Sequence, residues 1–265
     1  MKKIMTLAAI FAAVMMGFSA CQPEDQPSTP GTEETPGTEE TPGTEETPGT
    51  EETPGTEETP GTNDEAPASV ITIDGDFSDW EALGEDVATA VCDPEANWTA
   101  LTTLKAYATA DAVYVYFEYV AEDIDPASTP VHLYIDADNS AETGGYGDQF
   151  ATATIDWLTE GFIFADGAPQ SYDGGLYAWV GEVGANGWGW SADALYAGFT
   201  NGAGTDNKYE LKITKELVED IEFAETFGLG VDIQLSWESV GVLPNAACTD
   251  DNTAGLAPLL LVTTK

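Results

Sequence analysis

The sequence predicts an all-β domain, an antiparallel β-sandwich with one short helix, preceded by a disordered linker. From residue 66 onward, short runs of apolar and aromatic residues alternate with polar ones, as they do on strands that bury one face. Turns rich in Gly, Asp and Asn separate these runs at the spacing typical of a sandwich or barrel. Residues 21–65 show neither feature. We therefore expect one domain over 66–265, a size that can bury a substantial core.

The strand pattern is clearest over residues 101–123, LTTLKAYATADAVYVYFEYVAED, which predict two long strands joined at Asp111. In the second strand, Val113 and alternate residues after it face one way, whereas Tyr114 and Tyr116 face the other. Residues 214–221, TKELVEDI, predict the one helix, with Thr214 as its cap. The other expected strands open the segment 68–80 and occupy 130–136, 150–158, 175–181, 187–199, 208–214 and 227–237.

The first 20 residues predict a lipoprotein signal peptide. Lys2 and Lys3 precede an apolar stretch, and small residues come before Cys21. Ser19, Ala20 and Cys21 resemble the lipobox of bacterial lipoproteins, in which the signal is cleaved and the cysteine carries the lipid. The alternative is an ordinary signal peptide that ends beside a cysteine. No later run has the roughly 20 apolar residues that cross a bilayer, so we expect an anchored chain rather than a spanning one.

Residues 21–65 predict a disordered acidic stalk. They contain five copies of TPGTEE and one variant, TPGTND. Proline and glycine in every unit interrupt helix and sheet, and the paired glutamates repel one another along the chain. Acidic residues soon after a lipidated cysteine resemble the surface-export signal of Bacteroidetes lipoproteins. Together these features predict a domain held at the cell surface, on the outer membrane, by a lipid at Cys21.

The charge of the chain narrows the choice of partner. The sequence has 48 Asp and Glu against 7 Lys and Arg, a net charge of −41. Nucleic acid and anionic membrane surfaces would repel such a chain, so neither is an expected partner, and a neutral glycan is favoured over an acidic one. The single histidine, His132, excludes a His-rich zinc site and argues against a Ser-His-Asp triad. We interpret it as a packed or edge residue of an apolar strand.

Two cysteines, Cys92 and Cys248, follow Cys21 in the sequence, and both lie in polar, loop-like segments. Cysteines of exported domains are usually paired, so the sequence predicts a disulfide that ties the start of the domain to its end. Two separate thiols are the alternative.

Four motifs, taken in order, carry a family resemblance. The motifs are IDGDFSDW (73–80), AVYVYFEYVAED (112–123), VHLYIDADNSAETGG (131–145) and KYELKITKELV (208–218). They resemble family 9 carbohydrate-binding modules and the wider DOMON-like β-sandwich superfamily, and the resemblance extends from Ile71 to about Trp237. It implies a β-sandwich that binds saccharides or other ligands, sometimes with structural calcium, and it does not itself imply catalysis.

The segment IDADNSAETGG (135–145) is a candidate calcium loop. Asp136, Asp138 and Ser140 place oxygens at alternate positions, as EF-hand loops do. The glycine expected at the sixth position is Ala141, so Asp148, backbone carbonyls and waters would have to complete a different cage. The alternative is a turn that ends the strand, with polar side chains capping backbone amides. A second acidic group of the same kind consists of Asp74, Asp76 and Asp79.

Aromatic side chains are the candidate sugar-binding surface, because sugars place their C–H faces on aromatic rings. Trp98, in the loop DPEANWTA, is the first candidate for an exposed ring. Tyr172, Tyr177 and Trp179 come next, since SYDGGLYAWV puts the last two on one face beside a glycine-rich loop. The other tryptophans are interpreted as core or hairpin packing: Trp80, Trp157, Trp188, Trp190 and Trp237.

These observations favour a non-catalytic surface lipoprotein whose β-sandwich binds carbohydrate, with calcium as a possible support for its loops. The main alternative is a structural or protein-interaction module of a surface complex, without a sugar site. A glycoside hydrolase is the third hypothesis. It has little support, because a pair of carboxylates can always be nominated in a chain this acidic.

Overall fold

The computed structural model of the chain describes residues 70–125, 129–146, 148–205 and 207–265. The chain divides into two units, Met1–Thr62 and Asn63–Lys265. The expected signal peptide (1–20), Cys21 and the stalk (21–65) lie outside the described residues. Among the described residues, no helix combines the length and apolar character needed to cross a membrane.

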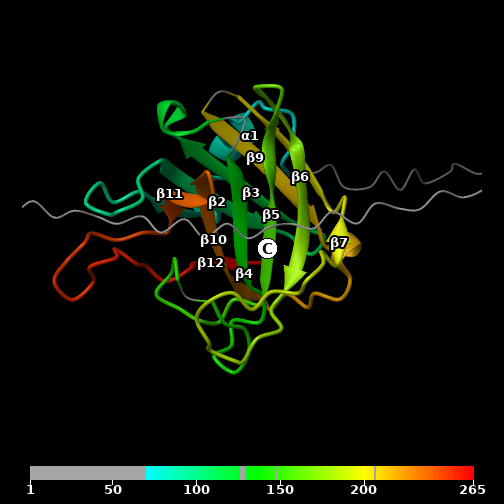
Figure 1. The fold of residues 1–265 in the computed structure, drawn as a ribbon. Coiled ribbons are helices and arrows are strands. Elements are labelled where there is room, and N and C mark those ends of the chain that lie inside the picture. Colours follow the sequence, from blue (N-terminus) through cyan, green and yellow to red (C-terminus); the bar gives the residue numbers. More distant parts are fainter. Residues whose placement is uncertain (1–69, 126–128, 147, 206) are drawn as a thin grey trace, which may run out of the picture. The chain divides into compact units, whose positions relative to one another are not determined.

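The domain is a sandwich of two antiparallel sheets, as predicted (Figure 1). The smaller sheet has the strand order β1-β2-β3-β9-β8, and the larger has the order β11-β10-β4-β5-β6-β7, with β12 also paired to β10. The smaller sheet consists of β1 (Ala88–Val91), β2 (Leu101–Ala108), β3 (Ala112–Tyr119), β9 (Lys208–Thr214) and β8 (Thr200–Gly204). The larger consists of β11 (Glu238–Leu243), β10 (Thr226–Leu235), β4 (Pro130–Asp136), β5 (Trp157–Ala165), β6 (Ala168–Ala178), β7 (Tyr196–Ala197) and β12 (Leu260–Thr263).

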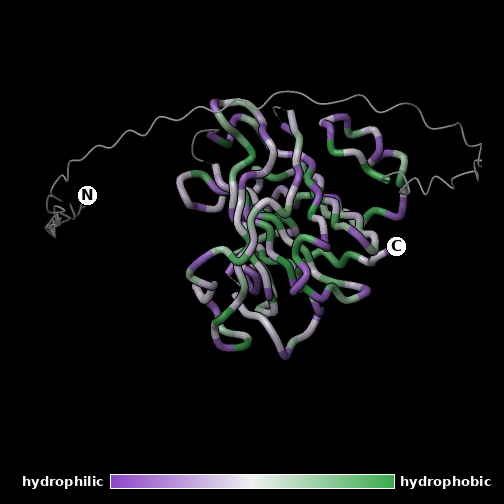
Figure 2. Tube along the Cα trace, turned by 90° about the vertical axis from the view of Figure 1, so that its right-hand side faces the viewer, coloured by the Kyte–Doolittle hydropathy of each residue, from purple (hydrophilic) through white to green (hydrophobic). Residues whose placement is uncertain are grey.

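The main core lies between the sheets. Strands alternate, so Val113, Val115 and Phe117 of β3 face Leu133 of β4 and Val231 of β10 in one buried cluster. Figure 2 shows this apolar interior, with hydrophilic residues concentrated in the loops around it. The alternation predicted for β3 is therefore confirmed.

The outer face of the smaller sheet is covered by the segment that precedes β1. Tyr114 and Tyr116 pack there against Trp80, which belongs to the short helix α1 (Ser78–Ala82). Glu210 fixes this segment, since its carboxylate accepts hydrogen bonds from Trp80 Nε1 at 2.9 Å and from the backbone N–H of Gly75 at 2.8 Å. The strand expected at the start of 68–80 is wrong, because the segment bends to reach Glu210 instead of pairing with a sheet.

The helix expected at 214–221 is a short 3₁₀ helix, η3 (Lys215–Val218). The side chain of Thr214 makes no capping hydrogen bond there, so the predicted cap is wrong. Its neighbour in the chain, Lys215, instead donates from Nζ to the carbonyl oxygen of Thr109. Two further 3₁₀ turns are η1 (Gly84–Asp86) and η2 (Ala121–Asp123).

The outer face of the larger sheet carries its own buried aromatic cluster. Tyr134 of β4 packs there with Tyr146, Phe150 and Trp190, which come from the segments before β5 and after β6. Gly230 of β10 makes room for Phe150, because a Cβ at that glycine would lie 2.3 Å from the ring. These covering segments are mostly loop, so the strands expected at 150–158 and 187–199 are reduced to the start of β5 at Trp157 and to the short β7.

Candidate functional site

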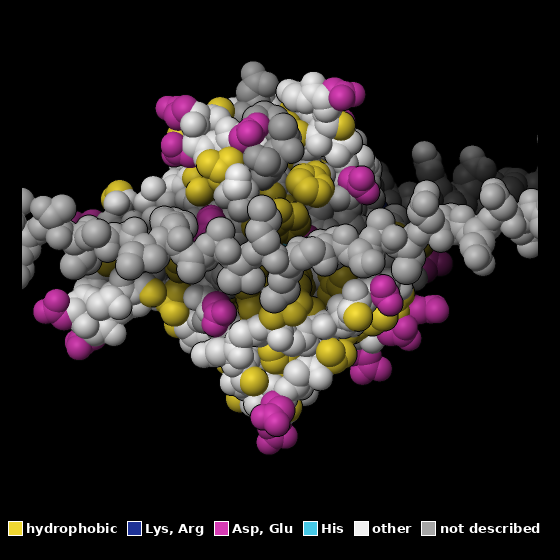
Figure 3. Space-filling view, in the orientation of Figure 1, with side chains coloured by type: hydrophobic (Ala, Val, Ile, Leu, Met, Phe, Trp, Pro, Cys, Tyr) yellow, Lys and Arg dark blue, Asp and Glu magenta, His cyan; other side chains and the backbone are white. Residues whose placement is uncertain are grey.

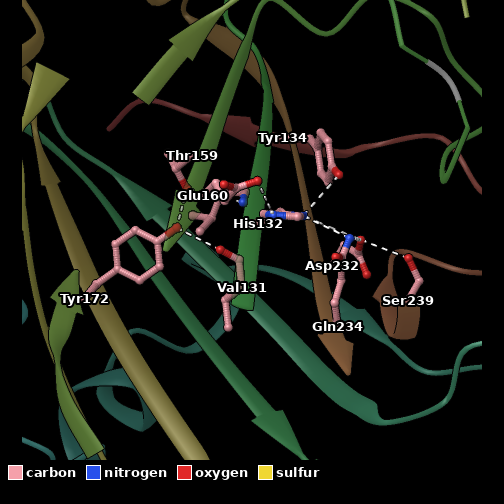
Figure 4. A network of polar contacts seen from close by, with 10 residues as sticks. Val131, His132, Tyr134, Thr159, Glu160, Tyr172, Asp232, Gln234 and Ser239 are labelled. Atoms are coloured by element: carbon pink, nitrogen blue, oxygen red, sulfur yellow. Dashed lines mark hydrogen bonds and ion pairs between the residues drawn. The ribbon is translucent and has the colours of Figure 1, made fainter. Parts of the chain in front are cut away.

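A row of three ionisable side chains crosses the centre of the larger sheet. Asp232 of β10 is paired in register with His132 of β4, and His132 is paired in register with Glu160 of β5. The apolar neighbours of these residues, Val131 and Val231, face the core, so the row faces outward. Figure 4 shows the imidazole lying between the two carboxylates.

Hydrogen bonds join the row into a network. His132 Nε2 lies 3.1 Å from Glu160 Oε2, and its Nδ1 lies 3.8 Å from Asp232 Oδ2. Gln234 Nε2 lies 3.1 Å from His132 Nδ1 and donates to Asp232 Oδ2 at 2.7 Å. Ser239 Oγ, on the neighbouring strand β11, donates to the same carboxylate oxygen at 2.9 Å (Figure 4). Each side chain is thus held in one orientation by its neighbours.

The network is buried and charged. His132 is 3% exposed and Asp232 is fully buried, whereas Glu160 is 25% exposed. Burial alone would lower the pKa of His132, but its hydrogen bonds with Asp232 and Glu160 raise that pKa above the ordinary value. The two carboxylates thus outweigh the effect of burial on the pKa of this imidazole.

A pocket of about 620 Å³ opens directly above this network. Two of its aromatic side chains project far into solvent, since Trp188 is 68% exposed and Trp237 is 61% exposed. Such exposure is uncommon for tryptophan, which usually buries most of its surface. The pocket is lined by Trp98, His132, Tyr146, Gln149, Glu160, Trp188, Gln234, Trp237, Glu238 and Ser239.

The backbone of the β10–β11 hairpin presents Trp237 to this pocket. The hairpin turns through Ser236 and Trp237, whose φ angles are 53° and 69°. Two-residue hairpin turns with both central residues at positive φ normally use Asn and Gly, because a bulky side chain is strained there. A tryptophan in this conformation stores strain of the kind found at functional sites.

Another part of the pocket lining rests on stacked aromatic rings. Tyr146 stacks on Tyr134 with 5.6 Å between ring centroids and an interplanar angle of 14°. Trp188 meets the ring of Tyr146 edge to face at 6.2 Å. Tyr134 belongs to β4 and is almost fully buried, so the exposed indole of Trp188 is connected through rigid packing to the central strand of the sheet.

Of the four expected ligand-binding residues, one lines this pocket and three lie elsewhere. Trp98 is in the pocket. Tyr172 is a correction, because it is buried between the sheets and its hydroxyl donates to the carbonyl oxygen of Val131 at 2.8 Å (Figure 4). Tyr177 packs against the aromatic cluster around Tyr134, and Trp179 lines a separate groove.

The pocket residues that the sequence reading missed are Trp188, Trp237, His132 and its carboxylate partners. The sequence predicts packing roles for Trp188 and Trp237, and a packed or edge position for His132. One signal could have found Trp237, because the polar–aromatic pair SW separates two apolar alternating runs as a hairpin turn does. The outward register of His132 with Asp232 depends on strand pairing and could not be read from the chain.

The candidate calcium loop is a turn beside an acidic cluster. Asp138 Oδ1 accepts a hydrogen bond from the backbone N–H of Ser140 at 3.0 Å, and Thr143 Oγ1 also donates to that carboxylate. Carboxylate oxygens of Asp136, Asp138 and Asp156 lie within 4.8 Å of one another. Asp156, which the sequence prediction did not include, thus stands with Asp136 and Asp138, and Ser140 Oγ accepts a hydrogen bond from the backbone N–H of Glu142 within the turn.

Asp148 is exposed and is not among the carboxylates of that cluster. Burial, together with the nearby Asp138 and Asp136, raises the pKa of Asp156 to about 6, against the lowering effect of a backbone hydrogen bond from Ala137. Asp136 is 5% exposed, and its Oδ1 has no hydrogen-bond partner among the described residues. A buried, unpaired acceptor beside two further carboxylates matches the oxygen ligands that Ca²⁺ prefers.

The second acidic group forms ordinary turn hydrogen bonds. Asp74 Oδ1 accepts from the backbone N–H of Asp76 at 2.8 Å, and Asp79 Oδ2 accepts from that of Thr72 at 2.9 Å. These carboxylates cap the loop that leads into α1.

The expected disulfide is also corrected, because Cys92 and Cys248 are both free, half-buried thiols. Their loops do lie side by side, since Cys248 N–H donates to the carbonyl oxygen of Glu95. Cys92 Sγ, however, accepts a hydrogen bond from Asn245 Nδ2 at 3.4 Å, so its contact across the two loops is with an amide.

Scans against protein-family models and against curated proteins found no match to this chain.

Proposed function

We propose that this domain is a non-catalytic binding module for carbohydrate. The observation that carries the proposal is the combination, in one pocket, of exposed tryptophans at the rim and a fixed polar network at the floor. Saccharides present apolar C–H faces and hydroxyl groups together, so they need both kinds of surface. Pockets that pair aromatic walls with a few oriented polar groups are typical of small-ligand sites.

Each part of the pocket has a role in this proposal. Trp188 and Trp237 stack on sugar rings, and Trp98 adds a third indole. Glu160 accepts hydrogen bonds from hydroxyl groups, and Gln234 donates hydrogen bonds to them. Both side chains are held in place by His132. Hydrogen bonds to a charged acceptor are stronger than neutral ones, which favours a hydroxyl-bearing ligand over an apolar one.

The charge of the pocket selects against acidic glycans. Glu160 and Glu238 line it, and Asp232 lies beneath it. A uronic acid or sulfated sugar would bring like charges close to these carboxylates in a partly desolvated space. The glycan of the proposal therefore lacks acidic groups, in agreement with the neutral glycan expected from composition.

The cellular setting is also a proposal. The lipobox-like Cys21 and the repeat stalk support a lipid anchor on the outer membrane, with the domain held out at the cell surface. Calcium is proposed as a support for the loops, held by Asp136, Asp138 and Asp156, because the ion would neutralise carboxylates that otherwise repel one another.

The test is a glycan array probed with the full chain, once with calcium and once with a chelator. We expect binding to one class of non-acidic glycan. Trp188→Ala should weaken that binding by about tenfold or more, since truncating a central tryptophan typically costs over 1 kcal/mol. Leu217→Ala is the matched control, because Leu217 is also an exposed large apolar residue, at 52%, but lies on η3 outside the pocket.

The outcomes separate the hypotheses. Equal loss in Trp188→Ala and Leu217→Ala would mean that the pocket is not the site. Silence of the folded chain on all glycans would favour the protein-interaction module, with Trp188 and Trp237 as contacts for another surface protein.

A further inference from the structure

We infer that the pocket above the Asp232–His132–Glu160 row selects a saccharide that carries a protonated amino group. This inference rests on the proposed function, which asks only that the glycan lack acidic groups. It adds that the ligand is cationic, with an ammonium group placed among the carboxylates and indoles of the pocket.

The first support is the balance of charge at the floor and rim. Glu160 and Glu238 line the pocket. Asp232 lies just beneath it and accepts hydrogen bonds from Gln234 and Ser239, which belong to the pocket lining. Against these three carboxylates stands one imidazole, His132, which is already shared between Asp232 and Glu160. Even with His132 protonated, negative charge is in excess, and a partly buried excess of charge favours a counter-charge on the ligand.

The second support is the position of the lysines. Every lysine of the described residues has a partner away from the pocket. Lys105 lies over the Tyr116 ring and Lys212 over the Tyr114 ring on the outer face of the smaller sheet, and Lys208 pairs with Glu118 there. The other two lysines also have partners outside the pocket, since Lys215 lies over the Phe223 ring and Lys265 forms an ion pair with Asp86.

The consequence is an uneven charge distribution over the described residues. On the face drawn in Figure 3, their visible charged side chains are Asp and Glu. Among the residues that the structure describes, no lysine lines the pocket, so a cationic ligand would meet no competing ammonium group there.

The third support is the kind of aromatic residue at the rim. The indole face is the best side-chain partner for an ammonium ion, and the attraction strengthens when the pair is shielded from water. Trp98, Trp188 and Trp237 come from three different loops and line one pocket with the ring of Tyr146. An amino sugar uses both properties of this rim, because its ring stacks on one indole while its ammonium approaches another.

The chemistry of the acceptors points the same way. Glu160 and Glu238 line the pocket with carboxylate oxygens. An ammonium group offers three donors and no acceptor, so it complements these oxygens better than a hydroxyl does.

The experiment measures Kd by calorimetry for the full chain with three tetrasaccharides at mildly acidic pH. One is built of β-linked glucosamine, the second is its N-acetylated counterpart and the third is the glucose counterpart. We expect the glucosamine form to bind at least about tenfold more tightly than both neutral forms, and the advantage to shrink as salt is raised. Tetralysine is the fourth probe, because a chain this acidic attracts any cation.

Variants locate the effect. Glu238→Gln, at the exposed rim, should reduce the preference for the amine severalfold while binding of a neutral form persists. Glu85→Gln, an exposed acid of η1, removes the same charge outside the pocket and should leave the preference unchanged. Glu160→Gln should act as Glu238→Gln does, and circular dichroism checks that this partly buried variant folds.

Each of the following results would overturn the inference. Neutral forms that bind as well as the amine would do so, and the proposed function would stand. Tetralysine binding as tightly as the amino sugar, or equal effects of Glu85→Gln and Glu238→Gln, would assign the preference to the general charge of the chain. Failure of all three sugars while the glycan array finds another ligand would refute the inference alone, whereas silence in both experiments would refute it together with the proposed function.

Discussion

Asp232 and His132 occupy directly opposed positions on β10 and β4, and the shared carboxylate oxygen Oδ2 also receives hydrogen bonds from Gln234 and Ser239. A charged pair at the centre of a sheet is costly unless each group is satisfied. Here the pair is extended to Glu160 by a second in-register step, so the imidazole has a carboxylate on each side. The row lies on the outer face of the larger sheet, beneath an open pocket and not in the core between the sheets.

The first prediction concerns pH. The pKa of His132 is raised in the folded state, so its contribution to stability is complete below the unfolded value of about 6.5 and is lost as pH rises through the folded value. Asp156 has a folded pKa of about 6, above the unfolded value of about 3.9, so it lowers stability as pH rises between these two values. We expect the unfolding temperature to fall steadily as pH is raised from about 4 to about 8.

Two variants separate these windows in thermal unfolding scans. His132→Gln keeps hydrogen-bonding capacity without a charge and should flatten the curve above about pH 6.5 only. Asp156→Asn should make it shallower between about pH 4 and pH 6 only, because Asp136 and Glu210, whose pKa values burial also raises, still contribute to the fall. A wild-type unfolding temperature that rises through the upper window would show that His132 is not held as the imidazolium.

The second prediction is a trade between stability and binding at Trp237. Asn tolerates a positive φ, so Trp237→Asn should relieve strain and raise the free energy of unfolding by about 1 kcal/mol. The same variant should weaken glycan binding, because the 61% exposed indole is removed from the pocket. Urea denaturation and the glycan assay measure the two effects.

Trp237→Ala is the comparison for that result. Alanine removes the ring but still carries a Cβ at positive φ, so we expect the loss of binding without the gain in stability. If Trp237→Asn and Trp237→Ala were equally stable, the turn would not be strained by its side chain.

Much of the fold could be predicted because local patterns determine it. The runs PVHLYID and KYELKIT correspond to β4 and β9 residue for residue, since turns flank them and their alternation is strong. The opening segment 68–80 misled because Ile71 is apolar yet packs beneath α1, on a surface that exists only after Glu210 of β9 is in place. Such contacts join residues far apart in the chain, and a single sequence does not reveal them.

The site was harder to predict than the fold for the same reason. Trp98 was selected because its own loop is polar, which is a local signal. The row of Asp232, His132 and Glu160 is assembled by strand pairing, and each residue looks unremarkable in its own strand. Tyr172 shows the converse error, because a tyrosine beside glycines can be a ligand contact or, as here, a buried residue whose hydroxyl is satisfied by Val131 and Thr159.

The third prediction concerns calcium. If an ion is held by Asp136, Asp138 and Asp156, adding calcium to chelator-treated protein should raise the unfolding temperature, because only the folded state assembles the three carboxylates. Asp156→Asn should abolish this response. In the absence of calcium the same variant should be at least as stable as the wild type, since it removes repulsion from Asp136 and Asp138.

Asp148→Asn is the matched control, because Asp148 is exposed and lies outside that cluster. It should retain the full response to calcium. An equal response in all three proteins would place any calcium binding elsewhere on this acidic surface.

The fourth prediction tests how the pocket wall is supported. Gly145 lies against Trp179, and a Cβ at Gly145 would come within 2.3 Å of the indole ring. Gly145→Ala should therefore force the ring aside and cost about 2 kcal/mol of unfolding free energy, as overpacking in a rigid site does. Glycan binding should fall as well, because Tyr146 follows directly in the chain and stacks on Tyr134 beneath Trp188.

A double variant distinguishes this clash from a general backbone effect. Trp179→Leu shortens the side chain that the new methyl group would meet, so Gly145→Ala should cost less in that background than in the wild type. Unfolding free energies of the four proteins give the coupling between the two sites. Additive costs would mean that Gly145 is needed for its backbone alone, and that the indole of Trp179 does not fix the position of the loop that carries Tyr146.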